Sequence, residues 1–302
     1  MLKKKVESVS IIIPIYNNQR LLSIALKSII SQKIPENIKF NVYIIDDGSP
    51  DFDEFEVSDI INGFSKKSRS NIACHFYRNE VNLGTVKTLN RILSIQDSDL
   101  IIPLAVDDEF YDVYTVIDII EHFNSNNCLI ATAKRLPVNE SKSFDIKPNI
   151  NQIRLFDDSR ALLRYITING NIISGASTYY RKEIFQKIGK FDETYRLLED
   201  YPFYLDVLKN DIEISFIDRI TIKYNLSGIS SGKITNVQLI EDFRRSAKYV
   251  VENFEFLTER EKKKILYFRV LTEQEKKKLR LSYIDCFAEE AIRKLYRKLK
   301  WG

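Results

Sequence analysis

Short apolar runs alternate with amphipathic segments along the first 110 residues of the chain. Four runs, each bounded by polar sequence, predict buried strands. They lie at residues 9–15, 39–45, 73–77 and 100–106. Three segments between them place apolar residues at helical spacing. They lie at residues 19–31, 53–65 and 85–95. This β-α-β alternation predicts an α/β fold with a mostly parallel sheet flanked by helices.

The second half continues with fewer regular repeats. The pattern predicts a strand at residues 172–180 and helices at residues 182–188 and 201–209. Residues 237–256 and 267–301 again place apolar residues at helical spacing, between clusters of lysine. We therefore expect a main domain at residues 1–235 and a helical C-terminal extension at residues 236–302.

Charge distinguishes this extension from the main domain. From residue 260 onward the chain holds 14 Lys and Arg against 6 Asp and Glu, although the net charge of the whole chain is only +4. Residues 292–301 have the pattern of a basic amphipathic helix, which can lie on an anionic membrane surface. A solvated helical face packed on the main domain explains the pattern equally well. The sequence indicates no nucleic-acid partner and leaves the oligomeric state open.

Composition excludes several other classes of protein. No run approaches the roughly 20 apolar residues of a membrane-spanning helix. The apolar segment near the N-terminus is short, contains Pro14 and lacks a small-residue cleavage site, so we expect a cytoplasmic protein, with peripheral attachment to the inner face of the membrane as an option. The chain has only two His, which disfavours a His-rich zinc site and a Ser-His-Asp triad. Its three Cys are scattered without the spacing of metal ligands.

Carboxylates follow two of the predicted strands. Asp46 and Asp47 end the second, and Asp107 and Asp108 end the fourth. Ligands of open α/β sheets bind at the carboxyl ends of strands. Carboxylate oxygens suit Mg²⁺ or Mn²⁺, and phosphates complete the shell of such an ion. The pattern therefore favours a divalent cation holding an anionic ligand, although a turn or helix cap uses the same residue types.

Six motifs in this order resemble the family 2 glycosyltransferases of the GT-A fold. They are VSIIIPIYN at residues 9–17, IDDGS at 45–49, NLG at 82–84 with Asn90, LAVDD at 104–108, GKFDE at 189–193 and LEDY at 198–201. The resemblance covers residues 8 to 231 and leaves the C-terminal extension outside it. It implies a nucleoside diphosphate sugar, expected to be UDP-linked, bound with a divalent cation, Mn²⁺ or Mg²⁺.

The resemblance also implies which residues bind the donor. These are Pro14, Tyr16, Asp46, Asp47, Asn82, Gly84 and Asp107. Asp47, or alternatively Asp46, would accept a hydrogen bond from the imide N–H of a pyrimidine base. Tyr16 would cover the plane of the base, and Asp107 would contact the ribose.

The resemblance further implies that Asp108 binds the metal ion, with Asp107 beside it. Many members of the family carry a further Asp two residues before this pair, where this chain has Ala105, so the number of protein ligands stays open. The segment at residues 224–231 resembles the part of the family that closes over the donor phosphates, but it contains no His. A plain Gly-Ser loop explains this segment equally well.

In the same way, Asp200 would be the general base, and Glu199 would orient the acceptor or the loop. An inverting transfer needs a carboxylate that takes the proton of the acceptor hydroxyl as its oxygen attacks the anomeric carbon. Taken without the resemblance, both acids are explained by the first turn of a helix, where negative charge is favourable.

The expected function is therefore an inverting, metal-dependent glycosyltransferase. It would move a sugar to a hydroxyl of a glycan or lipid-linked glycan acceptor, in the synthesis of a bacterial capsule, O-antigen or other surface polysaccharide. Two alternatives remain: a nucleotidyltransferase of similar architecture, and a catalytically silent GT-A-like scaffold. The first would carry a Gly-rich basic loop after its first strand, which residues 16–19 lack.

Overall fold

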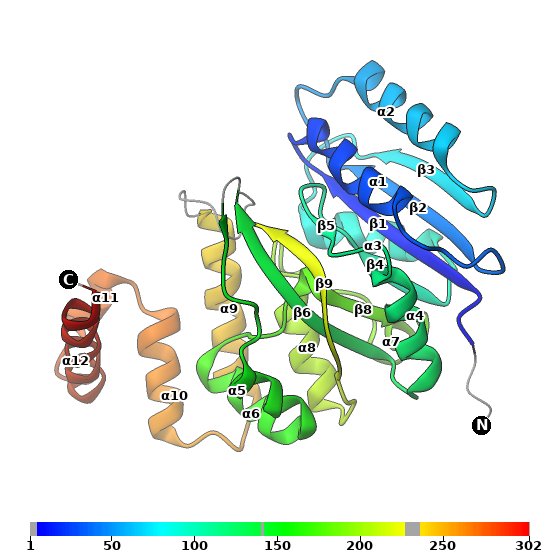
Figure 1. The fold of residues 1–302 in the computed structure, drawn as a ribbon. Coiled ribbons are helices and arrows are strands. Elements are labelled where there is room, and N and C mark those ends of the chain that lie inside the picture. The colour runs from blue at the N-terminus through cyan, green and yellow to red at the C-terminus, as the bar shows by residue number, and fades with distance from the viewer. Residues whose placement is uncertain (1–4, 140–141, 227–235, 302) are drawn as a thin grey trace.

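A single mixed sheet runs through the computed structural model, which describes residues 5–139, 142–226 and 236–301. Nine strands of the described residues form it, with helices on both faces (Figure 1). The strands are β1 (Ser8–Ile15), β2 (Lys39–Asp46), β3 (Ile72–Arg78), β4 (Leu100–Pro103), β5 (Glu109–Phe110), β6 (Ile130–Asn139), β7 (Lys142–Ser143), β8 (Thr178–Arg181) and β9 (Ser215–Asn225). Their spatial order is β3-β2-β1-β4-β8-β6-β9-β5, and β7 pairs with β6.

The N-terminal half of the sheet is parallel. Strands β3, β2, β1 and β4 pair in register, so that Ile13 lies opposite Ile44 and Ile11 opposite Ile102. Beyond β4 the directions mix, because β8 runs antiparallel to both β4 and β6 while β9 runs parallel to β6. The carboxyl ends of β1, β2 and β4 thus share one edge, as the sequence predicts.

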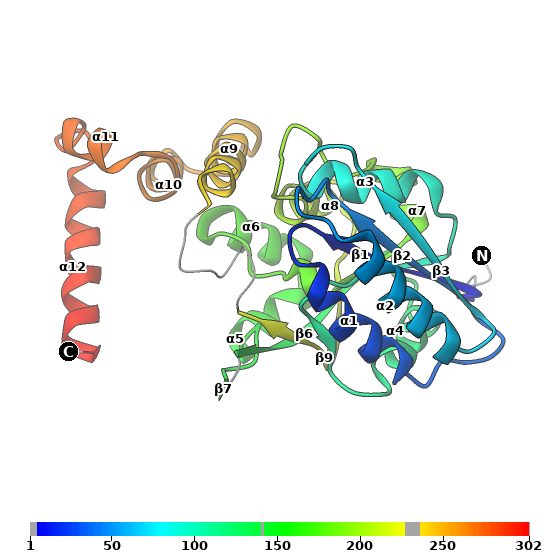
Figure 2. The same ribbon diagram turned by 90° about the horizontal axis from the view of Figure 1, so that it is seen from above.

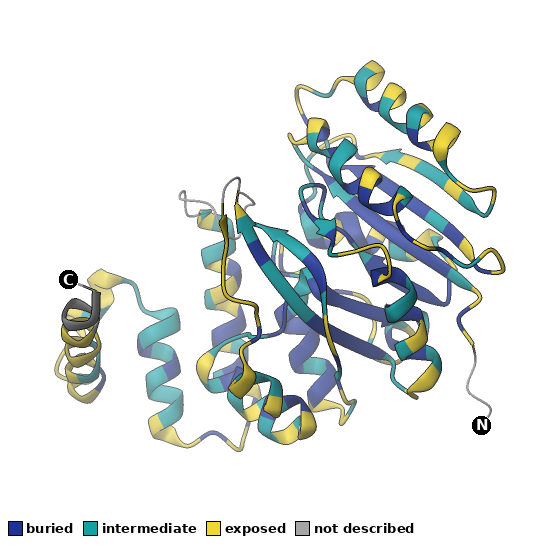
Figure 3. Ribbon diagram, viewed as in Figure 1, coloured by how far each residue is buried: buried dark blue, intermediate teal, exposed yellow. Residues whose placement is uncertain are grey.

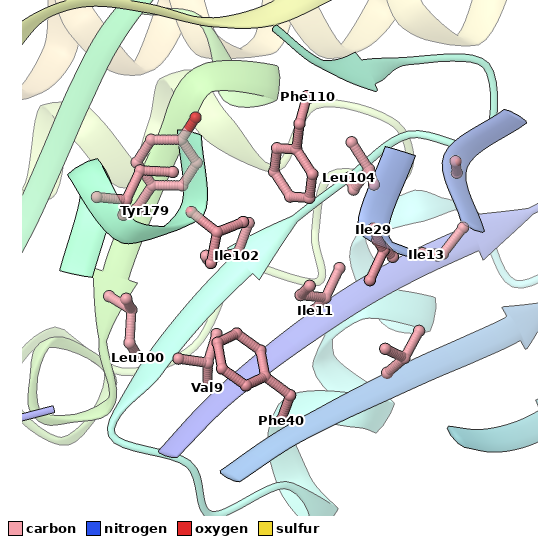
Figure 4. Packing of buried hydrophobic residues seen from close by; sticks show 14 of the residues in the cluster. Val9, Ile11, Ile13, Ile29, Phe40, Leu100, Ile102, Leu104, Phe110 and Tyr179 are labelled. Carbon is pink, nitrogen blue, oxygen red and sulfur yellow. The ribbon is translucent and has the colours of Figure 1, made fainter. Parts of the chain in front are cut away.

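Both faces of the central strands β1 and β4 are buried, whereas the edge strand β3 is only partly buried. In β1 the side chains of Val9, Ile11 and Ile13 pack into one core (Figure 4), whereas Ile12 packs into a second core on the other face. Burial on both faces explains why β1 and β4 are nearly continuous apolar runs rather than alternating ones. Figure 3 shows the same pattern as dark ribbon through the middle of the sheet.

The described residues form twelve α-helices; most flank the sheet, whereas α11 and α12 lie away from it (Figures 1 and 2). The first core packs against α1 (Leu22–Ile30), α2 (Glu54–Lys67) and α4 (Thr115–Ser125). The second core packs against α3 (Thr85–Ile95), α6 (Ser159–Asn169), α7 (Lys182–Ile188), α8 (Asp200–Lys209) and α9 (Val237–Asn253). Helix α10 (Glu259–Ile265) also reaches the second core, through Ile265. The others are α5 (Ile150–Ile153), α11 (Glu273–Lys278) and α12 (Ile284–Trp301).

Two predicted strands are too long. The run at residues 100–106 is a strand only to Pro103. The last hydrogen bond to β1 is the one from Leu104 N to Ile12 O, at 2.9 Å. The chain then turns, and Asp108 N donates to Ala105 O at 3.1 Å. Val106 stays buried after the strand has ended, which explains why the apolar run continues. The run at residues 172–180 is strand only from Thr178, after a 3₁₀ turn at Gly175–Ser177.

The C-terminal extension is not uniform. Helix α9 packs into the second core through Ala247 and Val250, beside α8 and α6. Residues 267–301, expected to be helical, form a π-helical turn at Leu266–Val270 followed by two separate helices, α11 and α12. The break has a local cause, because Thr272 caps α11 with a capping box to Glu275 and so starts a new helix.

Helix α12 stands apart from the α/β body (Figure 2). It contacts the rest of the extension through ion pairs, such as Lys263 with Asp285 at 2.8 Å and Lys264 with Glu289 at 2.6 Å. In the described part of the chain, every helix is too short or too polar to cross a bilayer. The division at residue 235 stays a prediction, although α9 is packed as part of the main domain.

Candidate active site

A cavity of about 710 Å³ lies at the edge where β1, β2 and β4 end. Its walls come from these strand ends, from the start of α3, from the segment before α8 and from α9. Both predicted groups of acids reach it: Asp47, Asp107 and Asp108 from the sheet, and Glu199 and Asp200 from the start of α8. The cavity has the size of a typical small-molecule site.

Pro14 and Tyr16 line this cavity where β1 ends, as expected for a nucleoside-contacting wall. Ala105 lines it as well, beside Asp107. The closing segment predicted at residues 224–231 lies outside the described residues from residue 227 onward. Up to that point, Tyr224, Asn225 and Leu226 form part of the wall.

The carboxylate of Asp46 is used within its own turn. It accepts hydrogen bonds from Ser49 N at 3.0 Å and Ser49 Oγ at 2.5 Å, and Arg78 Nε lies 3.2 Å away. Asp46 is fully buried and does not reach the cavity wall formed by the described residues. Of the two acids after β2, Asp47 is therefore the one placed to contact a ligand.

Asp47 organises the loop that joins β3 to α3. Its Oδ1 accepts from Asn79 Nδ2 at 2.8 Å, Leu83 N at 2.9 Å and Thr88 Oγ1 at 2.6 Å. Its Oδ2 accepts from Gly84 N at 2.9 Å. A carboxylate offers about four acceptor positions, two on each oxygen. Oδ2, with one protein donor, therefore retains the capacity to accept a hydrogen bond from a ligand.

Asn82 and Gly84 lie behind the described cavity wall rather than on it. The carbonyl and side-chain oxygens of Asn82 accept from Arg196 Nη2 at 3.0 and 2.7 Å. Gly84 has φ of +87°, and a Cβ added there would lie 2.5 Å from Arg196 Cγ. Only glycine fits this conformation and this close approach. In the structure both residues shape the loop that Asp47 holds.

Asp108 is the most buried acid that lines the cavity. Its Oδ1 accepts from Asn225 N at 2.8 Å, whereas Oδ2 is buried without a hydrogen-bond partner in the part of the chain that the structure describes. Burial raises the pKa of Asp108 to about 8. Burial also raises the pKa of Asp107. An uncompensated buried carboxylate of this kind is costly, and a cation would relieve the cost.

These carboxylates therefore fit a divalent cation. Among residues 5–139, 142–226 and 236–301 no three His, Cys, Asp or Glu side chains form a ready cage for a metal ion. Mg²⁺ is commonly held by one or two carboxylates while substrate phosphates and water supply its other ligands. Asp108, with Asp107 beside it, matches that arrangement, and Ala105, which also lines the cavity, supplies no further ligand.

Glu199 and Asp200 lie at the start of α8. Asp200 Oδ1 accepts from Tyr201 N at 2.6 Å, and Oδ2 accepts from Asn171 Nδ2 at 3.3 Å. Gly175 leaves space for this carboxylate, because a Cβ there would lie 3.3 Å from Asp200 Oδ2. Burial raises the pKa of both acids, and the charge of Asp200 raises that of Glu199 further. A carboxylate with a raised pKa is a better proton acceptor near neutral pH.

The sequence reasoning missed Arg135 on β6. Its guanidinium donates from Nη1 to Ser174 Oγ at 2.8 Å and lies over the ring of Tyr224, 4.3 Å from the centroid. Its positive charge lowers the pKa of both Asp108 and Asp200, opposing the effect of burial. Its Nε is buried without a partner among the described residues. The available signal was a Lys-Arg pair within the apolar run of residues 129–138.

Helix α9 was also missed as part of the site. Leu239 and Phe243 line the cavity, and Phe243 is 43% exposed although it is aromatic. The amphipathic pattern of this helix gives no sign of which domain its apolar face contacts. Its role therefore became visible only in three dimensions.

Comparison with known proteins agrees with this geometry. The model of the family described as glycosyl transferase family 2 matches residues 10–189. A "PGL/p-HBAD biosynthesis glycosyltransferase" of Mycobacterium tuberculosis is 23% identical over 261 residues, which cover 85% of this chain and 91% of that protein. An "uncharacterized glycosyltransferase" of Rickettsia typhi is 24% identical over 234 residues, 76% of this chain and 67% of that protein.

Solved structures show the same fold. TarS 1–349 of S. aureus, in complex with UDP-GlcNAc, has a TM-score of 0.59 at 21% identity, covering 86% of this chain and 70% of that one. The chain spans only 42% of the longer TarS structure, which has a TM-score of 0.58. The fold is thus of the GT-A type, and with the match to the family model over more than half its length, the chain belongs to glycosyl transferase family 2 as a glycosyltransferase of the hexosyltransferase type.

Proposed function

We propose that this glycosyltransferase is an inverting, metal-dependent enzyme that moves one sugar from a nucleoside diphosphate sugar to a hydroxyl of a glycan or lipid-linked acceptor. The observation that carries the proposal is one cavity lined by two pairs of acids: Asp107 and Asp108, which follow β4, and Glu199 and Asp200, at the start of α8. One acid group suits a cation with a diphosphate, and the other suits a general base.

The donor would lie across the ends of β1, β2 and β4. Tyr16 covers the base, Asp47 Oδ2 accepts its imide N–H, and Asp107 contacts the ribose. Tyr16 and Asp47 both line the cavity, which supports this orientation. The complexes of the TarS neighbours with UDP and UDP-GlcNAc make a uridine nucleotide the first donor to test.

The divalent cation, Mn²⁺ or Mg²⁺, would be held by Asp108 with Asp107 beside it. When bound, it would neutralise negative charge on the diphosphate. Asp108 Oδ2, which has no partner among the described residues, supports this assignment.

Asp200 would act as the base on the acceptor side. Its carboxylate takes the proton of the acceptor hydroxyl while that oxygen forms a bond to the anomeric carbon. The bond from the anomeric carbon to the donor diphosphate breaks, and the nucleoside diphosphate leaves with the bonding electrons. Glu199 would orient the acceptor. Arg135 lowers the pKa of both Asp108 and Asp200 against the effect of burial, and so favours the ionised form of an acid in each half of the site.

The test is transfer or donor hydrolysis with UDP-sugars in Mn²⁺, in chelator, and with Asp200→Asn. We expect activity in Mn²⁺ alone, and UDP binding by Asp200→Asn without turnover. Activity that survives both chelator and the substitution would refute the mechanism. UDP binding with no turnover of any sugar by the wild type would favour the silent scaffold, and transfer of a nucleotidyl group would favour the nucleotidyltransferase.

We further propose that the C-terminal extension attaches the enzyme peripherally to an anionic membrane surface, where a lipid-linked acceptor in surface polysaccharide synthesis would be found. On α12 the apolar side chains Ile284, Ile292 and Leu295 are between 60% and 68% exposed. They lie at helical spacing, and Leu295 lies within the basic sequence at residues 293–300, which directly follows Ile292. Exposed apolar area next to positive charge fits the surface of an anionic bilayer.

Vesicle flotation with the full chain tests this attachment. We expect binding to vesicles of phosphatidylcholine with phosphatidylglycerol, weak binding to phosphatidylcholine alone, and release by the double substitution Ile292→Glu and Leu295→Glu. Phe55→Glu is the matched control, because Phe55 is 87% exposed on α2, at the other side of the molecule. Equal binding by the double variant would refute the proposal.

A further inference from the structure

The segment that leads into α8 joins the two halves of the site. Residues 195–198 run between the loop held by Asp47 and helix α9, and they end directly before Glu199 and Asp200. Arg196 O accepts from Val86 N, in the first turn of α3, at 3.2 Å. We call residues 195–198 the bridge segment.

On the donor side, Arg196 fastens this bridge segment to the loop before α3. Its Nη2 donates to Asn82 O at 3.0 Å and to Asn82 Oδ1 at 2.7 Å. Gly84 packs so closely against Arg196 that a Cβ would meet Arg196 O at 2.6 Å. The same loop is held by Asp47 through Leu83 N and Gly84 N. Asp47 and the bridge segment are therefore linked through direct contacts with the same loop.

On the other side, the bridge segment is held by one buried carboxylate of α9. Asp242 is only 3% exposed, and its Oδ2 accepts from Arg196 N at 3.0 Å and from Leu197 N at 2.6 Å. Its Oδ1 accepts from Gln238 Nε2 at 3.1 Å. A buried acid is costly unless donors satisfy it, and three donors do so here. Two of the three are backbone groups within three residues of Glu199.

We infer that Asp242 and Arg196 are positioning residues that hold the Glu199–Asp200 pair in register with the donor half of the cavity. Asp242 does not line the cavity described, so it acts through the backbone of the bridge segment rather than on the substrate. This inference rests on the proposed function, in which Asp200 is the base. It also makes α9 a part of the catalytic unit, because this helix supplies Asp242 as well as the cavity wall.

Three variants of the full chain test the inference. Asp242→Ala removes the acceptor of both backbone N–H groups. Asp242→Asn keeps one side-chain oxygen to accept them but removes the charge. Glu241→Ala is the matched control, since Glu241 is the neighbouring, exposed residue of the same helix. The measurements are kcat and donor KM, UDP affinity, and amide hydrogen exchange of residues 192–200 with and without UDP.

For Asp242→Ala we expect kcat to fall about 10- to 100-fold, the size of effect that a misplacement of about 1 Å produces. UDP affinity should change by less than about threefold, because Asp47 and Tyr16 are untouched. Asp242→Asn should recover much of the lost kcat, and Glu241→Ala should match the wild type. Exchange of residues 196–200 should be faster in Asp242→Ala, and UDP should no longer slow it.

Two results would overturn the inference. One is an Asp242→Ala variant that is folded and keeps kcat within about threefold of the wild type. The other is a loss of UDP affinity as large as the loss of kcat, which would indicate general destabilisation. If Asp242→Ala does not fold, Arg196→Ala takes its place: wild-type kcat in that variant, together with faster exchange of the bridge segment, refutes the inference. If the wild type shows no turnover with any donor, the proposed function is refuted. Hydrogen exchange in Asp242→Ala would still show whether Asp242 holds the bridge segment in place.

Discussion

Replacing Gly84 with alanine separates the cost of a backbone conformation from the cost of a close contact. Gly84 has φ of +87° and ψ of 160°, and Gly170, at the end of α6, has φ of 95° and ψ of 170°. An added Cβ at Gly84 would meet Arg196 Cγ at 2.5 Å and Arg196 O at 2.6 Å, whereas at Gly170 it would meet nothing within 4 Å. Gly170→Ala is therefore a matched control for conformation alone.

The magnitudes follow from these contacts. A non-glycine residue in this region of φ and ψ costs about 1–3 kcal/mol, and both variants incur that cost. At Gly84, Arg196 must also move. Its movement weakens the bond from Val86 N, which is worth about 1 kcal/mol, and strains the bond from Gly84 N to Asp47, which is worth about 1.5–3 kcal/mol because the acceptor is charged. We expect Gly84→Ala to lose about 4–6 kcal/mol of unfolding free energy and Gly170→Ala about 2 kcal/mol.

Urea denaturation followed by circular dichroism measures both losses, and UDP titration measures the site. A loss of about 4–6 kcal/mol is a large part of the roughly 5–15 kcal/mol that stabilises a typical domain. The midpoint should therefore fall far more for Gly84→Ala, and only this variant should bind UDP more weakly. Equal losses in the two variants would refute the reasoning, because they would show that the contact with Arg196 adds nothing to the backbone cost.

Three further predictions concern the acids of the cavity. Asp200→Asn should lower transfer about 10²- to 10⁴-fold and should raise the melting temperature at pH 7, measured by activity assay and thermal shift. The sign follows from the raised pKa of Asp200. Because this pKa is higher in the folded than in the unfolded state, the folded protein loses stability as the pH rises from the unfolded to the folded pKa. Asparagine carries no charge and avoids this loss. An unchanged or lower melting temperature of Asp200→Asn would contradict this prediction. In the wild type, kcat/KM should fall as pH is lowered through the raised pKa values of Glu199 and Asp200, so its acid limb should lie above the ordinary carboxylate range near pH 4; a limb at or below pH 4 would be inconsistent with a buried base. Arg135→Met should shift that limb to higher pH, because Arg135 lowers the pKa of Asp200, and an unshifted limb would exclude this role.

The parallel half of the sheet could be predicted from sequence because its signals are local. Strands buried on both faces are continuous apolar runs, and the polar residues after them mark the ligand edge. Only the end of the run at residues 100–106 was placed wrongly, since Val106 is buried by the core without being part of a strand. Apolar character reports burial, not backbone conformation, and so it cannot locate the turn that presents Asp107 and Asp108.

What escaped prediction depends on contacts between distant segments. Arg135 meets the charges of Asp108 and Asp200 only because β6 lies beside β8 and β9 in the folded sheet. Asp242 is one acid among many on an amphipathic helix, and its burial is decided by the bridge segment, more than 40 residues earlier in the chain. Such residues carry no local pattern, so that their roles follow from topology alone.

The contact between Gly84, Arg196 and Asp242 also limits how this enzyme can be recombined with its relatives. A chimera that exchanges the donor-binding half at a point between α3 and α8 would pair one parent's loop before α3 with the other parent's bridge segment. The guanidinium of Arg196 would then face a loop that did not evolve against it, even if every acid of the cavity were retained. Crossovers placed after Val270 avoid this mismatch, because α9 and the segments it holds then come from one parent.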